Sequence, residues 1–254
     1  QLSDTIAASL AGARITNDGY VRDPDTGRRF NDDDTSAFRF KMVMNPSDAF
    51  RATLSVDRTS QEAALTMGRP MADLRATSLF PAGVVVLQPG SQGEWDRTAK
   101  TSFGDDKGQD LKHMGGSLAL EWDLNQQWQF KSISAYRALR TNSYIDIDAS
   151  EFELGDVLVA LDQNQTSQEF QLHYDNGSNL HATFGAYYMR ENVPSYQEAY
   201  ASDLFQMLGS GINFLRTIED DLTTTSTAAF AHVDWEFMPT WNLSLALIGT
   251  LSVI

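Results

Sequence analysis

The chain has 254 residues, and its 34 Asp and Glu against 19 Lys and Arg give a formal net charge of -15. This charge argues against a nucleic-acid partner, because a phosphate backbone attracts basic surface. The absence of cysteine excludes disulfide scaffolds, thiolate zinc sites and cysteine nucleophiles. No apolar run approaches the roughly 20 residues of a membrane-spanning helix, but strands of a membrane β-barrel need only about 10 alternating residues.

The first predicted elements are a weak strand over residues 5–15 and a clear hairpin that pairs residues 38–44 with 50–56. In the hairpin, Phe38 and Phe40 share one face, whereas Arg39 points to the other face, which is the period of two of a pleated strand. A slip of one residue would send the charged side chains to the apolar face, so the pairing is strongly specified.

The same alternation recurs in three further hairpins. Their strands are residues 118–122 with 128–136, residues 170–174 with 180–188, and residues 229–237 with 241–247. Together with the opening strand, the four hairpins give nine predicted strands. A short turn joins the two strands of each hairpin, and the four short turns lie at the same end.

The connections at the other end are long. We predict them over residues 16–34, 58–113, 139–166 and 191–223, with a short helix within 203–218 that Gly209 and Gly211 interrupt. Soluble domains rarely contain several such loops, whereas outer-membrane barrels combine short turns with long loops. A soluble β-sandwich is the alternative, and it leaves the loops unexplained.

Tryptophan placement favours the membrane interpretation. Trp122, Trp128, Trp235 and Trp241 all flank short turns, and only Trp95 lies in a long connection. Trp prefers the membrane boundary, where its ring is buried and its N–H stays hydrated. We therefore predict a lipid-facing surface that includes Phe38, Leu54, Leu120, Phe184, Val233 and Leu245, and a polar opposite face.

Several strands resemble those of TonB-dependent outer-membrane receptors. Residues 131–137 (KSISAYR) resemble the family's SxTxYR strand, and residues 163–172 (QNQTSQEFQL) resemble the strand that contains SQE. Residues 185–188 (GAYY) and 223–234 (TTTSTAAFAHVD) resemble the following strands in the same order, and residues 2–27 resemble the segment before them.

The resemblance implies a 22-stranded barrel that an N-terminal plug fills, and that imports nutrients such as ferric siderophores, cobalamin or glycans with energy from the TonB complex. The plug and the TonB box have no counterpart here, and the family pattern is lost after Leu247. We expect residues 1–254 to be one partial barrel domain, an all-β antiparallel transmembrane fragment whose end is truncated or frame-shifted. The implied partners are outer-membrane lipid, a nutrient ligand, and TonB through the plug.

Four histidines are present, and two of them are a candidate pair for metal binding or titration near neutral pH. If residues 176–178 form a three-residue turn, His173 and His181 face each other on the polar side. Polar filling of the barrel interior is the favoured interpretation of this pair. His113 and His232 have no obvious partner in the predicted hairpins.

Acidic residues gather in the connections, at Asp23, Asp25, Asp32, Asp33, Asp34, Asp105, Asp106, Asp146 and Asp148. Residues 23–27 superficially suggest a calcium loop but lack the third ligand and the closing glutamate of an EF-hand. Solvated loops are therefore the favoured interpretation.

No catalytic motif is present: there is no G-x-S-x-G, no H-E-x-x-H and no P-loop. Carboxylates could pair for glycoside hydrolysis, but alternation alone places them on the polar face; they are Asp57, Glu121, Glu169, Asp234 and Glu236. We predict no catalytic, cofactor-binding or metal-binding residue, and a receptor segment rather than an enzyme. The alternative is a secreted carbohydrate-binding module or glycosidase.

Overall fold

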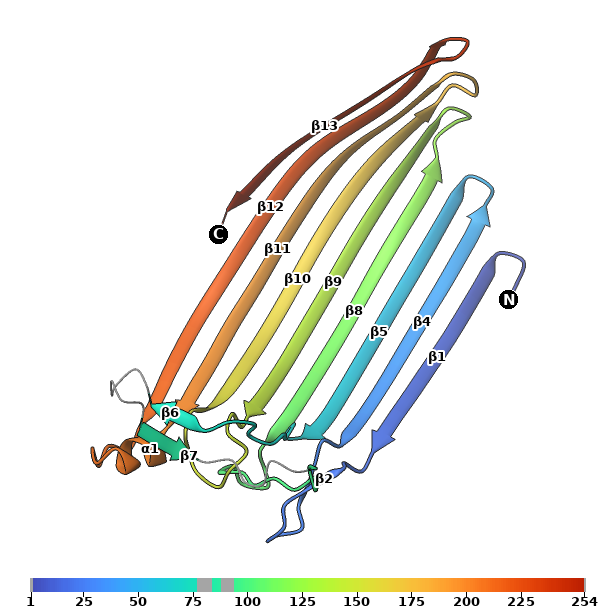
Figure 1. The fold of residues 1–254 in the computed structure, drawn as a ribbon. Coiled ribbons are helices and arrows are strands. Elements are labelled where there is room, and N and C mark those ends of the chain that lie inside the picture. The colour runs from blue at the N-terminus through green and yellow to red at the C-terminus, as the bar shows by residue number, and fades with distance from the viewer. Residues whose placement is uncertain (1, 77–83, 88–93, 254) are drawn as a thin grey trace.

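The computed structural model describes residues 2–76, 84–87 and 94–253. Within these residues, nine long strands form one antiparallel sheet (Figure 1). In chain order they are β1 (Ile6–Asn17), β4 (Asp33–Ser47), β5 (Phe50–Ala64), β8 (Gly108–Asp123), β9 (Trp128–Ile145), β10 (Asp156–Asp175), β11 (Leu180–Tyr200), β12 (Leu215–Met238) and β13 (Trp241–Val253). The nine predicted strands and their hairpin pairings are confirmed.

Each long strand pairs with the next long strand along the chain, so the sheet is a meander. β1 and β13 lie at its opposite edges, and in the described part of the chain each of them pairs on one side only. Figure 1 shows short turns at one end of the strands and the loops at the other. The sheet is an open, curved wall that does not close on itself.

The backbone ladders keep their register over long distances. Between β5 and β8, Phe50 pairs with Trp122 and Ala64 pairs with Gly108, and the residues between them stay in step. Within the nine-stranded sheet, register shifts occur only beside the β4–β5 and β12–β13 turns. Side chains at even spacing therefore stay on one face from the turns to the loops.

Local chemistry closes the short turns. In the turn between β8 and β9, the side-chain oxygen of Asn125 accepts hydrogen bonds from the backbone N–H groups of Gln127 (2.9 Å) and Trp128 (3.1 Å). The Asn125 side chain thus imitates a backbone acceptor, which is why Asn is common in turns. In the turn between β12 and β13, Thr240 has a φ of 76°.

Three of the predicted connections are too long. The observed connections are residues 65–107, 146–155 and 201–214, in place of 58–113, 139–166 and 191–223; part of the first lies outside the described residues. Beyond the apolar region the strands carry polar residues on both faces, and Arg140 forms an ion pair with Asp162 across β9 and β10. The ladder therefore continues where the apolar and polar alternation stops.

Short elements occupy the loop end of the sheet. They are the hairpin of β2 (Val21–Arg22) and β3 (Arg29–Phe30), the hairpin of β6 (Leu74–Ala76) and β7 (Val84–Leu87), and helix α1 (Ser202–Met207). The predicted helix is thus confirmed only at its start, because Gly209 has a φ of 77° that ends the helical conformation.

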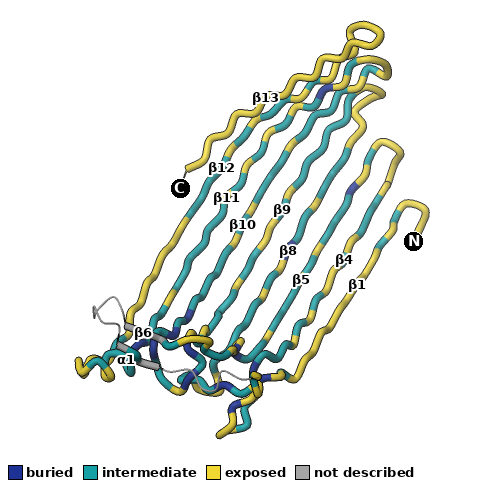
Figure 2. The backbone as a smooth tube through the Cα atoms, viewed as in Figure 1, coloured by how far each residue is buried: buried dark blue, intermediate teal, exposed yellow. Residues whose placement is uncertain are grey.

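The most deeply buried side chains gather at the loop end rather than along the sheet (Figure 2). They form a cluster of Val21, Phe30, Leu65, Met67 and Ala99, against which Trp95, Phe103 and Tyr144 pack. Within the described residues, no second sheet covers the long strands, and the two-stranded β2–β3 sheet contacts them only at the loop end. Among the described helices, none is long and apolar enough to cross a membrane.

Gly185 in β11 makes room for an aromatic ring on the neighbouring strand. It pairs with Phe230 of β12, and a Cβ atom built on Gly185 would lie 2.0 Å from Cζ of Phe230. The distal end of the ring therefore occupies the space over the glycine. An aromatic side chain that covers a strand glycine in this way compensates for the packing that glycine lacks.

We expect Gly185→Val to lower the free energy of unfolding by about 1 to 3 kcal/mol, because the new side chain and the Phe230 ring need the same space. The double variant Gly185→Val with Phe230→Ala should lose less stability than the sum of the two single variants. Denaturant titration of all four proteins measures this coupling. Additive losses would show that the ring does not lie over Gly185.

Candidate functional site

The two faces of the sheet differ in chemistry. On one face, large apolar side chains remain exposed, including Leu118 (38% exposed), Phe184 (43%) and Leu243 (41%). Phe38 and Leu245, which the sequence assigns to the same surface, are exposed as well. No described part of the chain covers this face, so it is an apolar surface in contact with its surroundings rather than half of an interior core.

Aromatic residues border the apolar face beside the short turns. Trp122, Trp235 and Trp241 are exposed, and the ring of Trp128 packs on Tyr174 with 4.7 Å between centroids. The rings of Phe237 and Trp241 lie 6.4 Å apart in the last turn. The predicted aromatic band at the turn end is confirmed.

One polar group interrupts the apolar face. Ser134 and Gln168 are register partners in the row that contains Leu54 and Leu118. The Ser134 hydroxyl donates to Oε1 of Gln168 (2.5 Å), and Nε2 of Gln168 donates to the Ser132 hydroxyl (3.0 Å). These polar side chains satisfy one another, which lowers the cost of placing them in apolar surroundings.

On the opposite face, three charged or polar side chains meet over Gly115. Nδ1 of His113 lies 3.4 Å from Asp57, and the Arg137 guanidinium lies 3.3 Å from Nε2 of the same ring. Because a guanidinium only donates, Nε2 must accept and Nδ1 carries the hydrogen that points to Asp57. A Cβ atom on Gly115 would lie 3.2 Å from Asp57 and 3.3 Å from Arg137, so a larger residue there would press on both side chains.

A second polar chain runs along the same face nearer the turns. Gln171 donates to Glu169 (2.5 Å), His173 lies 3.0 Å from Oε1 of Gln171, and the other ring nitrogen of His173 lies 3.0 Å from the Thr183 hydroxyl. Nε2 of His173 therefore donates to Gln171, and Nδ1 accepts from Thr183. These contacts make the face a polar wall.

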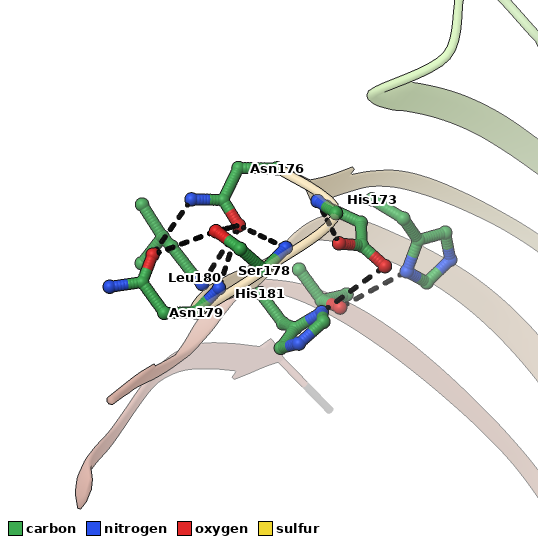
Figure 3. A network of polar contacts seen from close by, with 9 residues as sticks. His173, Asn176, Ser178, Asn179, Leu180 and His181 are labelled. Carbon is green, nitrogen blue, oxygen red and sulfur yellow. Dashed lines mark hydrogen bonds and ion pairs between the residues drawn. The ribbon is translucent and has the colours of Figure 1, made fainter. Parts of the chain in front are cut away.

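The predicted facing of His173 and His181 is wrong, because the turn (Figure 3) is centred on Ser178 instead of Gly177. The side-chain oxygen of Asn176 accepts from the N–H groups of Ser178, Asn179 and Leu180, each at 3.0 Å. Moving the centre of the turn by one residue shifts the register by two residues. His173 therefore pairs with Thr183, and His181 lies 3.3 Å from Asp175.

The other two histidines also have partners that the sequence did not reveal. His113 contacts Asp57 and Arg137, as described above, and His232 lies 2.7 Å from Asp234, two residues along the same strand. The contact of His113 depends on the exact pairing of β5, β8 and β9. The i, i+2 spacing of His232 and Asp234 on one face was a readable signal.

The carboxylates considered for glycoside hydrolysis do not pair with one another. Glu121 forms an ion pair with Lys131 (3.0 Å), Asp57 contacts His113, and Glu169 accepts from Gln171. Asp234 accepts from Ser244 and contacts His232. Each of these four carboxylates is thus held by its own neighbour on the polar face.

Most acidic residues of the connections belong to local structure. Asp23 accepts from the N–H groups of Asp25 (2.7 Å) and Thr26 (3.0 Å), so it shapes the β2–β3 turn. Asp25 lies 2.8 Å from Lys100 and is largely exposed, as predicted for a solvated loop. Asp105 and Asp106 are exposed in the same way and form ion pairs with Arg28 (3.5 Å) and Lys107 (2.8 Å).

Two carboxylates depart from the solvated-loop prediction. Asp146 and Asp148 follow β9, and together with Asp156, the first residue of β10, they place one oxygen each within 4.8 Å of the others. Asp156 is fully buried and Asp148 is 5% exposed. The sequence did not single out Asp156, which it placed within the connection over residues 139–166, because burial at a loop end leaves no mark in the sequence.

Hydrogen bonds hold two of these three side chains. Oδ1 of Asp146 accepts from the N–H groups of Asp148 (3.2 Å) and Ala149 (2.6 Å). Asp156 accepts from the Ser102 hydroxyl (2.6 Å) and from the N–H of Ile147 (3.1 Å). Oδ2 of Asp146 and both oxygens of Asp148 are buried and accept no hydrogen bond.

Burial disfavours the charged form of all three groups. Desolvation raises the pKa of Asp156 to about 7 and that of Asp146 to about 6, although Ser102 and Thr101 partly oppose the two shifts. Desolvation also raises the pKa of Asp148, with Ser150 and the backbone of Leu154 near enough to oppose it in part. In the described part of the chain, no Lys or Arg forms an ion pair with these residues.

Comparison with protein-family models and with curated sequences finds no match. Solved structures do share the fold. They include the ferric yersiniabactin uptake receptor FyuA from Yersinia pestis, with a TM-score of 0.67 and 14% identity, and the siderophore receptor PiuA from Acinetobacter baumannii, with a TM-score of 0.65 and 16% identity. The open form of the ferric-catecholate import receptor Fiu from E. coli K12 has a TM-score of 0.60 and 12% identity.

These alignments cover 99% of this chain and 39%, 39% and 41% of the three receptors, respectively. The chain therefore spans about two-fifths of their length. At this level of identity the likeness concerns the fold, and it confirms the partial-barrel architecture that the strand pattern predicts.

We expect Asn176→Ala to lower the free energy of unfolding by about 1 to 2 kcal/mol, because three backbone N–H groups lose their acceptor. Ser178→Ala keeps the three backbone bonds and removes only exposed hydroxyl contacts, each of 3.2 Å, with the side-chain oxygens of Asn176 and Asn179, so it should change the free energy of unfolding by less than about 0.5 kcal/mol. Denaturant titration compares the two variants. Equal losses would mean that the Asn176 side chain does not organise the turn.

Proposed function

We propose that this chain forms part of the β-barrel wall of an outer-membrane receptor that imports a scarce nutrient. The observation that carries the proposal is the uncovered apolar face of the nine-stranded sheet. Monomeric water-soluble proteins rarely expose contiguous apolar surface of this extent. Hydrocarbon tails are the medium in which Leu118, Phe184 and Leu243 can remain exposed without cost.

The aromatic band supports the same placement. Trp122, Trp235 and Trp241 are exposed beside the short turns, at the height where a bilayer meets water. The loops then lie on the opposite side, which in barrels of this kind is the cell exterior. The polar face, with the group of Asp57, His113 and Arg137, lines the interior.

The edges of the sheet support a larger barrel. β1 and β13 each have one side without a partner strand in the described residues. An open edge in lipid leaves backbone N–H and C=O groups unpaired, at a cost of several kcal/mol for each group. We therefore assign residues 1–254 to a partial barrel domain whose edges pair with further strands, and we place the energy-coupling contact with TonB in a plug outside this domain.

The favoured nutrient class is a ferric siderophore. FyuA, PiuA and Fiu are receptors for ferric yersiniabactin, a siderophore and ferric catecholates, respectively, and their fold matches this chain over nearly its whole length. Cells that carry the intact gene should take up radiolabelled ferric catecholate faster than cells without it. Loss of this difference in cells that lack TonB supports TonB as the energy source. Equal uptake by cells with and without the gene, in the presence of TonB, contradicts the nutrient class.

Membrane fractionation tests the location directly. The protein should sediment with the outer membrane, resist extraction by high salt and enter solution only with detergent. A folded monomer in the aqueous fraction without detergent would instead favour a secreted carbohydrate-binding module or glycosidase and contradict the proposed receptor.

Single charges test the assignment of the two faces. We expect Leu118→Arg to destabilise the membrane-inserted protein by about 2 to 4 kcal/mol if residue 118 lies deep in the hydrocarbon. Ser117→Arg places the same charge on the polar face at the same height, so its effect should be smaller. Urea titration of both variants in phospholipid vesicles measures the difference, and equal effects would contradict the assigned faces.

A further inference from the structure

We propose that Asp146, Asp148 and Asp156 bind one divalent cation, with Ca²⁺ as the preferred ion. Asp146 and Asp148 follow the end of β9, and Asp156 is the first residue of β10. One oxygen atom from each of the three carboxylates lies within 4.8 Å of the other two. The site lies at the loop end, away from the apolar face, so its existence does not depend on the proposed receptor function.

Asp148 provides the independent observation that points to a ligand. Its side chain is 5% exposed, and neither of its oxygens accepts a hydrogen bond. A buried carboxylate needs donors or a cation to offset the loss of water. Ser150 and the backbone of Leu154 offset the burial of Asp148 only in part, and the two further carboxylates of the group repel its charge.

The other two carboxylates are already oriented for binding. The backbone N–H groups of Asp148 and Ala149 hold one oxygen of Asp146, while the second oxygen is buried without a partner. Ser102 and the N–H of Ile147 hold the two oxygens of Asp156. Such donors around metal-binding carboxylates fix the direction of the oxygens that face the ion.

The ligand atoms favour Ca²⁺ over other divalent ions. All three are carboxylate oxygens, which suit hard cations, and the group contains neither His nor Cys, which Zn²⁺ prefers. Oxygens no more than 4.8 Å apart can all reach one Ca²⁺ at about 2.3 to 2.6 Å, and Ca²⁺ accepts the irregular geometry of a loop, whereas Mg²⁺ needs a near-octahedral site and keeps several waters. Backbone carbonyls and water can supply the remaining ligands.

A bound cation would join separate segments of the loop end. Ser102, which bonds to Asp156, belongs to the connection between β7 and β8, and its neighbour Phe103 packs on Tyr144 and Tyr200 with 5.3 and 5.6 Å between ring centroids. Ca²⁺ would thus fix residues 146–156 against residues 101–103. The expected consequence is a stiffer outer surface at the mouth of the polar face.

Calcium titration of the full-length protein, after removal of metals with EDTA, tests the site. We expect one ⁴⁵Ca²⁺ bound per chain, with a dissociation constant on the order of 0.1 to 1 mM, as in extracellular calcium modules. Amide hydrogen exchange of residues 146–156 and 101–103 should slow when Ca²⁺ is added. Exchange in the long strands should not change.

Two variants give the result its specificity. Asp148→Asn keeps the shape of the side chain, removes its charge and should weaken calcium binding at least tenfold. Asp105→Asn removes an exposed charge from the neighbouring loop and should bind as the unchanged protein does. If exchange in the long strands shows that Asp148→Asn is misfolded, Asp146→Asn takes its place.

Three results would overturn the proposal. The first is that the unchanged protein binds no ⁴⁵Ca²⁺ at about 10 mM free ion, ten times the weak end of the expected range. The second is equal calcium binding by the Asp148→Asn and Asp105→Asn proteins. The third is that K⁺ at matched ionic strength slows amide exchange of residues 146–156 and 101–103 as much as Ca²⁺ does. Failure of the receptor proposal would appear separately in membrane fractionation, which does not depend on calcium.

Discussion

The uninterrupted antiparallel ladder is the constraint on which the rest of the molecule depends. Because the sheet shifts register only beside two of its turns, each residue keeps the same face from the turns to the loops. The ladder separates Leu118 from the polar face, and it also brings Asp57, Gly115 and Arg137 of three strands into one row. A single inserted residue would exchange the two faces of a strand.

The two ends of the sheet are stabilised in different ways. At the turn end, asparagine side chains act as local acceptors, so each turn depends on few other residues. At the loop end, distant segments depend on one another through the cluster of Val21, Phe30 and Leu65 and through the bond between Ser102 and Asp156. Substitutions at the loop end should therefore affect several connections together, whereas a turn substitution should affect one hairpin.

The sequence predicts the features that a period of two encodes. The hairpins, the nine strands and the apolar face follow from alternation, and the resemblance to outer-membrane receptors led to the fold that the solved structures share. The parts of the strands next to the loops could not be predicted, because polar residues on both faces remove the alternation there. The predicted pairing of His173 failed because the centre of one turn lies one residue later than expected. The Asp156 site depends on burial among segments more than 50 residues apart.

The length of β12 has a consequence for the height of the wall. Its 24 residues extend roughly 80 Å along the strand, or roughly 55 Å along the membrane normal at a 45° tilt, whereas the hydrocarbon band is about 25 Å thick. More than half of this strand would then stand outside the lipid, at the level of the saccharide coat that surrounds such a cell. The rim of the sheet would meet large molecules from the medium well before they reach the lipid surface.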